Sequence, residues 1–92
     1  MSDILDEALV PSVDAVESAV GDETVILHLK SGIYFGLDPM GTRIWAMLKE
    51  GVSSAEICKR LTEEFDVSPD VVEADARRFL SELKANDILI NG

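Results

Sequence analysis

The segment Ser31–Trp45 constrains the fold most, because it places a tight turn, an apolar strand and a capped helix directly one after another. Gly32 can adopt the positive φ that a tight hairpin turn requires. Residues Ile33–Leu37 have the composition of a short strand, without charge or proline. Asp38 is a good helix N-cap, and a proline follows it at the first helical position. The segment therefore predicts a hairpin whose last strand leads straight into a helix.

The residues before this segment predict two further strands, at about 13–19 and 24–29, because apolar and polar side chains alternate there. The three strands should form an antiparallel meander, since short turns join them. Residues 1–12 are acidic, and Pro11 prevents a helix from continuing there. We therefore expect a flexible acidic N-terminal arm over 1–12 and one domain over 13–92.

The residues after this segment predict three helices. The first ends near Gly51, the second begins at a capping box at Ser53, and the third begins at Ser68 and ends at Asn86. Apolar residues then recur at helical spacing along each one. The predicted fold class is α+β, with a winged helix-turn-helix-like order of a three-stranded antiparallel sheet followed by three helices.

Charge excludes several classes of partner. The net charge is −10, and residues 1–23 contain seven acids and no base. Nucleic acids and anionic membranes attract proteins through Lys and Arg, so neither is an expected partner. The chain has no apolar run of about 18 residues and no basic signal-peptide head. Together with a single cysteine, these features favour a cytoplasmic location.

Residues that carry catalytic chemistry are few. His28 is the only histidine and Cys58 the only cysteine. We expect His28 on the outer face of the sheet in a structural role, and Cys58 as a small buried apolar residue. A nucleophile with a base and an orienting partner cannot be assembled from them. The sequence therefore predicts a protein that is not an enzyme and that holds no metal or cofactor.

The strand Ile33–Leu37 is the most informative candidate site. It lies at the edge of the predicted meander, where main-chain N–H and C=O groups lack a partner, and it has none of the charges or prolines that usually protect an edge. We place the Phe35 N–H among the free groups. An extended peptide can bind such an edge by adding a strand. The third helix would form the opposite wall, with Phe79 giving apolar contact and Arg78 and Asp75 setting the register.

Three alternatives remain at this point. The edge could be covered by the N-terminal arm or by a second copy of the chain in a homodimer. The second and third helices could be a DNA-reading pair, although acids outnumber Arg77, Arg78 and Lys84 on the third helix.

The residues Gly32–Trp45 resemble the segment "G-x-Y-F-x-L-N-x-x-G-x-x-I-W" of PqqD-like proteins. The capping box at Ser53–Glu56, the stretch Val72–Leu80 and the close at Leu83–Leu89 fit the same family. The resemblance covers roughly residues 13–90. Asp38 stands where the family usually has asparagine, and both residues cap helices well.

This resemblance implies a precursor-peptide recognition element. Such elements bind the leader of a ribosomally made precursor peptide and present it to a modifying enzyme. The lasso-peptide type partners a leader peptidase, and the pyrroloquinoline quinone type serves a radical enzyme. Because the chain carries no attached enzyme, a discrete element is expected, closer to the lasso type. The candidate peptide-binding residues are Ile33, Tyr34, Phe35, Gly36, Leu37, Val72, Asp75, Ala76, Arg78, Phe79 and Leu83.

Overall fold

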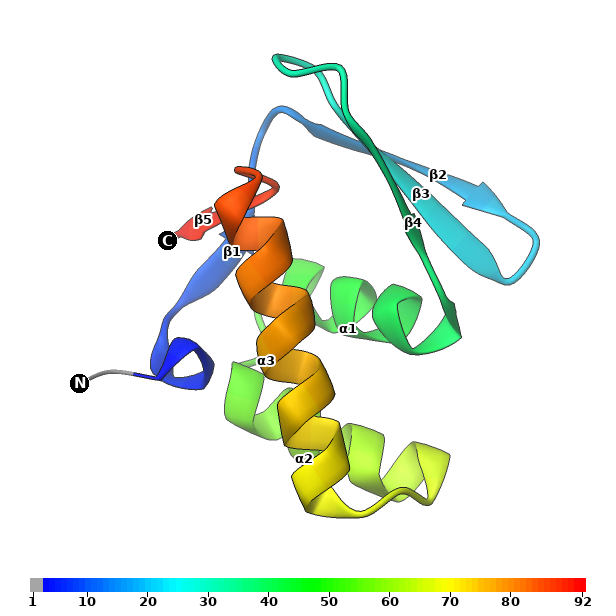
Figure 1. Cartoon of the computed structure of the whole chain (residues 1–92), viewed down its shortest axis with the longest axis vertical. Coiled ribbons are helices and arrows are strands. Elements are labelled where there is room, and N and C mark those ends of the chain that lie inside the picture. The colour runs from blue at the N-terminus through cyan, green and yellow to red at the C-terminus, as the bar shows by residue number, and fades with distance from the viewer. Residues whose placement is uncertain (1–2) are drawn as a thin grey trace.

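The computed structural model describes residues 3–92 and has two layers, a small sheet above a group of helices (Figure 1). Strands β2 (Ala15–Val20), β3 (Glu23–His28) and β4 (Tyr34–Leu37) form an antiparallel meander in the order β2-β3-β4. Helices α1 (Pro39–Lys49), α2 (Ser54–Phe65) and α3 (Pro69–Ala85) follow. The predicted order of three strands and three helices is therefore confirmed.

The ends of the helices follow from the local sequence. The Gly41 N–H donates to Asp38 Oδ1 at 2.7 Å, and the Glu56 N–H donates to Ser53 Oγ at 3.2 Å, so both predicted caps form. Ser68 precedes α3 without a side-chain capping bond. Gly51, with φ +82°, follows α1, because a positive φ ends a helix at little cost for glycine.

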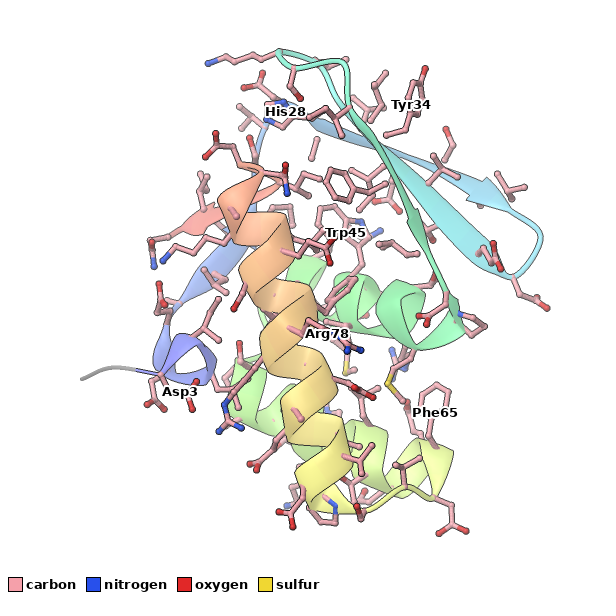
Figure 2. All side chains as sticks on the ribbon, in the orientation of Figure 1. Asp3, His28, Tyr34, Trp45, Phe65 and Arg78 are labelled. Atoms are coloured by element: carbon pink, nitrogen blue, oxygen red, sulfur yellow. The ribbon has the colours of Figure 1, made fainter. Side chains whose placement is uncertain are left out.

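The hydrophobic core lies between the sheet and the helices. Ile26 and Leu37 reach it from the sheet, and Trp45 lies beneath the sheet in α1 (Figure 2). The other helices contribute Ile57, Cys58, Leu61, Val72, Ala76, Leu80 and Leu83. Burying one face of the sheet on helices stabilises strands that would be marginal alone.

The structure differs from the expected N-terminal arm. Residues 1 and 2 lie outside the described residues, but Ile4–Asp6 form a short 3-10 helix, η1, and Leu9–Pro11 form strand β1. Strand β1 pairs antiparallel with β5 (Leu89–Asn91). The Leu9 side chain is only 6% exposed and belongs to the core. From residue 3 onward, the predicted arm is therefore folded against the domain.

Two ion pairs attach this N-terminal part to α3. The Arg77 guanidinium lies 2.7 Å from Asp3 Oδ2, and Lys84 pairs with Glu7. Hydrogen bonds from Arg77 lower the pKa of Asp3, and those from Lys84 and then Asn91 lower the pKa of Glu7.

No helix within residues 3–92 combines the length and apolar composition that crossing a membrane requires.

Candidate functional site

Strand β4 has a partner on one side only, because β3 is its single neighbour in the sheet. The His28 N–H donates to the Ile33 carbonyl at 3.0 Å, which fixes the pattern along the pair. Main-chain groups of successive residues in an antiparallel strand point to opposite sides. Those of Phe35 therefore point to β3, and those of Tyr34 and Gly36 point to the free edge. Our expectation that the Phe35 N–H is free was wrong by one residue.

The free groups of Tyr34 and Gly36 receive no main-chain bond from the rest of residues 3–92. The alternative in which the N-terminal arm covers this edge is not seen for residues 3–12, since β1 pairs with β5 instead. Tyr34 is 69% exposed and lies on the side of the sheet away from the helices (Figure 2). The edge is thus open, with its donors and acceptors directed outward.

The opposite edge of the sheet, β2, carries a charge that β4 lacks. The β2 residue Glu17 pairs with Ile26, so its side chain projects on the helix side, where Lys49 Nζ lies 2.7 Å from Glu17 Oε1. The hydrogen bond from Lys49 is the main cause that lowers the pKa of Glu17. Inward-pointing charges of this kind discourage strand addition. Of the two edges, β4 is the one without such protection.

A groove of about 210 Å³ begins where β4 ends. The first turn of α1 forms one wall, and the middle of α3 forms the other. The residues that line it are Asp38, Met40, Gly41, Ile44, Asp75, Arg78, Phe79 and Glu82. The groove therefore combines an apolar floor with a rim of three carboxylates and one guanidinium.

The groove divides the predicted residues of α3 into two sets. Asp75, Arg78 and Phe79 line it, as the sequence indicates. Val72, Ala76 and Leu83 are at most 1% exposed and face the core, so they are unavailable to a ligand in this structure. The prediction of these three as contact residues is corrected by their burial. Leu37 is likewise buried, at the end of β4.

Sequence reasoning missed five residues of the groove. Four of them, Asp38, Met40, Gly41 and Ile44, lie at the start of α1, and the fifth is Glu82. The start of α1 follows β4 directly, so it must lie beside the ligand-accessible end of the strand. Glu82 follows Asp75 at a spacing of seven, which places both on one face of a helix.

The bases of α3 are paired with acids. Arg78 lies 3.2 Å from Asp75, while Arg77 and Lys84 bind Asp3 and Glu7. Figure 2 shows Arg78 projecting from α3 on the β4 side. A DNA-reading helix needs basic side chains free for phosphates and bases. The pairing on α3 instead favours recognition of a ligand that is not a nucleic acid.

The two residues with catalytic potential are used structurally. His28 is 5% exposed and faces the core rather than the outer face, which corrects the predicted orientation. Its Nδ1 accepts the Ser31 N–H at 3.3 Å and lies 3.2 Å from Ser31 Oγ, so it supports the turn before β4. Burial raises the pKa of the Cys58 thiol, which makes it a poor nucleophile. No three potential metal ligands cluster within the described part of the chain.

An open strand edge beside a groove defines a class of small α+β module that can accept an added strand. The chain belongs to the PqqD family: the family model described as coenzyme PQQ synthesis protein D matches residues 23–89. That range contains β3, β4, all three helices and the groove. The resemblance seen in the sequence is therefore confirmed. A search of curated protein sequences finds no match.

Two solved structures share the fold. One, TbiB1 in complex with the TbiA(beta) leader peptide, is 41% identical over 87% of this chain and 93% of its own, with a TM-score of 0.82. The other, a lasso peptide synthetase B1 complexed with the leader peptide, is 24% identical over 90% of this chain and 98% of its own, also with a TM-score of 0.82. At that lower identity the second likeness supports the fold alone.

Proposed function

We propose that this protein is a non-catalytic module that captures the leader of a ribosomally made precursor peptide by strand addition at β4. It then presents the precursor to a modifying enzyme. The observation that carries this proposal is the outward direction of the Tyr34 and Gly36 main-chain groups at an unprotected edge beside the groove. The 41% identity to TbiB1, which was solved with a leader peptide, gives independent support.

Main-chain hydrogen bonds at the edge of β4 alone would bind a leader peptide only weakly, so tight binding requires the groove as well. Two residues with free N–H and C=O groups offer up to four main-chain bonds, and each contributes about 1 kcal/mol net. A total of about 4 kcal/mol corresponds to a dissociation constant near 1 mM, before the cost of ordering the peptide. Micromolar binding therefore needs side chains as well, and Phe79, Met40 and Ile44 provide apolar surface for them.

Among the enzymes that such a module serves, we favour a lasso-peptide leader peptidase, acting in the cytoplasm. The resemblance of the segment Tyr34–Leu37 to lasso-type members favours this choice, and the 41% identity to TbiB1, which was solved with a leader peptide, supports the leader-binding role that it requires. The alternative is delivery of a precursor to a radical enzyme of pyrroloquinoline quinone synthesis, which the family description favours. Both readings use the same edge and groove and need no bound cofactor.

Titration of the ¹⁵N-labelled protein with the TbiA(beta) leader peptide tests the proposal. Strand addition should shift the Tyr34 and Gly36 amides strongly downfield and slow their exchange with solvent, because each N–H gains a carbonyl partner. Asp75, Arg78 and Phe79 should shift as well. A peptide of the same composition in scrambled order is the control. Strong binding with shifts confined to residues outside β4 and α3 would reject strand addition here.

A homodimer would compete for the same edge. Sedimentation or sizing across a range of concentrations distinguishes the two uses of β4. A monomer that binds the leader with one-to-one stoichiometry supports the proposal. A stable dimer that the leader cannot dissociate would mean that a second copy covers the edge.

A further inference from the structure

Gly41 lies in the first turn of α1, close to the side chain of Phe79 in the middle of α3. It is the third residue of α1 and is buried. A Cβ built on Gly41 would lie 3.0 Å from Phe79 Cε1, 3.2 Å from Asp38 Oδ1 and 3.4 Å from Leu37 Cβ. A separation of 3.0 Å is tighter than most carbon–carbon contacts, so the Phe79 ring would have to move by a few tenths of an ångström to admit a Cβ. The Phe79 ring therefore uses the space that a side chain at position 41 would fill.

Of these three neighbours, the Phe79 ring has the most freedom to move. Asp38 is held by its capping bond to the Gly41 N–H, at 2.7 Å, and Leu37 is fixed in the core. Phe79 is only partly buried, and its ring lines the groove. A methyl group at position 41 would therefore displace the ring away from α1, into the groove.

We propose that Gly41 is a specificity-determining residue of the groove, because it lets the Phe79 ring lie back on the first turn of α1. This inference rests on the proposed function of the groove as a leader-binding site. The Gly41–Phe79 contact keeps the apolar floor open at the end of β4. An extended peptide paired with Tyr34 and Gly36 can then seat one apolar side chain on that floor. A side chain at position 41 narrows the space and selects against bulky residues in the peptide.

A double-mutant cycle tests the contact. The variants are Gly41→Ala, Phe79→Leu and the combination of the two, and Ser81→Ala on α3, outside the groove, is the control. Binding of the TbiA(beta) leader peptide is measured by calorimetry, and unfolding in urea is measured on the same samples. Gly41→Ala should weaken binding at least tenfold, while the double variant should bind no worse than Phe79→Leu alone. Ser81→Ala should bind like the wild type.

Two results would overturn the inference. One is a folded Gly41→Ala variant that binds the leader as the wild type does, and the other is a double variant whose losses simply add. If the Gly41→Ala variant is too unstable to fold, the double variant, in which the smaller side chain at position 79 relieves the contact, is compared with Phe79→Leu alone, and a double variant that also fails to fold would reject the contact. In a folded Gly41→Ala variant, NMR shifts of the Phe79 ring protons identical to those of the wild type would also reject the contact. If the wild type itself does not bind the leader, the proposed function fails, and the ring shifts still decide whether position 41 sets the ring's place.

Discussion

Lys49 Nζ lies 2.7 Å from Glu17 Oε1, and this pair joins α1 to the outer strand of the sheet, β2. It places a charge on the helix side of one edge, while β4 at the other edge has none. The two edges of the sheet therefore differ: an inward-pointing charge protects β2 against strand addition, and β4 is open next to the groove.

The Glu17–Lys49 pair should make stability depend weakly on pH. The folded pKa of Glu17 is lowered from an ordinary value of 4.5, so its stabilisation is present above pH 4.5 and is lost as the pH falls through the lower folded pKa. Because the pair is partly exposed, the effect is about 0.5 kcal/mol or less. The free energies of unfolding in urea of Glu17→Gln and of the wild type should converge as the pH falls through the lowered folded pKa of Glu17. A difference that persists unchanged at low pH would contradict this, and Glu63→Gln is the control.

Replacing Leu9 by alanine should lower the free energy of unfolding by about 2–4 kcal/mol, because it leaves a cavity in the core. The neighbouring Val10 is 37% exposed, so Val10→Ala should cost much less. Urea unfolding measures both. Equally small losses in the free energy of unfolding for both variants would mean that β1 contributes little to stability, as expected for a flexible arm.

Proline at position 34 should weaken leader binding while the fold is kept. Tyr34→Pro removes an N–H that points to the open edge, where proline is tolerated. Loss of one main-chain bond predicts roughly five- to tenfold weaker binding. Tyr34→Ala separates the effect of the side chain. Phe35→Pro should instead destabilise the sheet, since that N–H bonds to β3. Normal leader affinity in a folded Tyr34→Pro variant would show that this bond is not used.

Reversing the charge of Arg78 should change which peptides bind. Three carboxylates and one guanidinium line the groove, so Arg78→Glu makes it wholly acidic. A leader with an added glutamate should bind roughly tenfold more weakly at low salt, and one with an added lysine more tightly. Both effects should shrink as salt rises. Arg60→Glu makes the same change of net charge on α2, away from the groove. If the two variants behave alike, the effect belongs to the whole protein and not to the groove.

The local features of the fold were predictable because short segments encode them. The Asp38 cap, the Gly32 turn and the order of strands and helices all follow from residues close together in the sequence. Strand β1 was missed because its partner, Leu89–Asn91, lies at the other end of the chain. Nothing within residues 9–11 specifies so distant a strand.

The orientation of β3 was missed for a different reason. Apolar residues of β3 occur on both faces of the strand, so the two-residue period does not say which face meets the core. Gly32 has φ +72°, its N–H bonds to the His28 carbonyl, and the His28 N–H bonds to Ile33. Gly32 and Ile33 thus both oppose His28, as in a β-bulge. This extra residue determines which residues of β3 and β4 lie on the same face of the sheet. Ile26 therefore shares the inner face with Phe35, and His28 follows it inward.

The face of α3 was predicted only in part. The core residues Val72, Ala76, Leu80 and Leu83 form one stripe, and Asp75, Phe79 and Glu82 form a neighbouring one. The two stripes differ by about one residue, or roughly 100° around the helix. Sequence spacing defines both, but only packing decides which is covered by the core.

The pairing of β1 with β5 brings residues 9 and 91 opposite each other, on the far side of α3 from β4 (Figure 1). A short peptide bridge from residue 91 to residue 9 would close the segment 9–91 into a loop. The backbone could then be opened at the Gly21–Asp22 hairpin to make a circular permutant, with the capture surface left as it is.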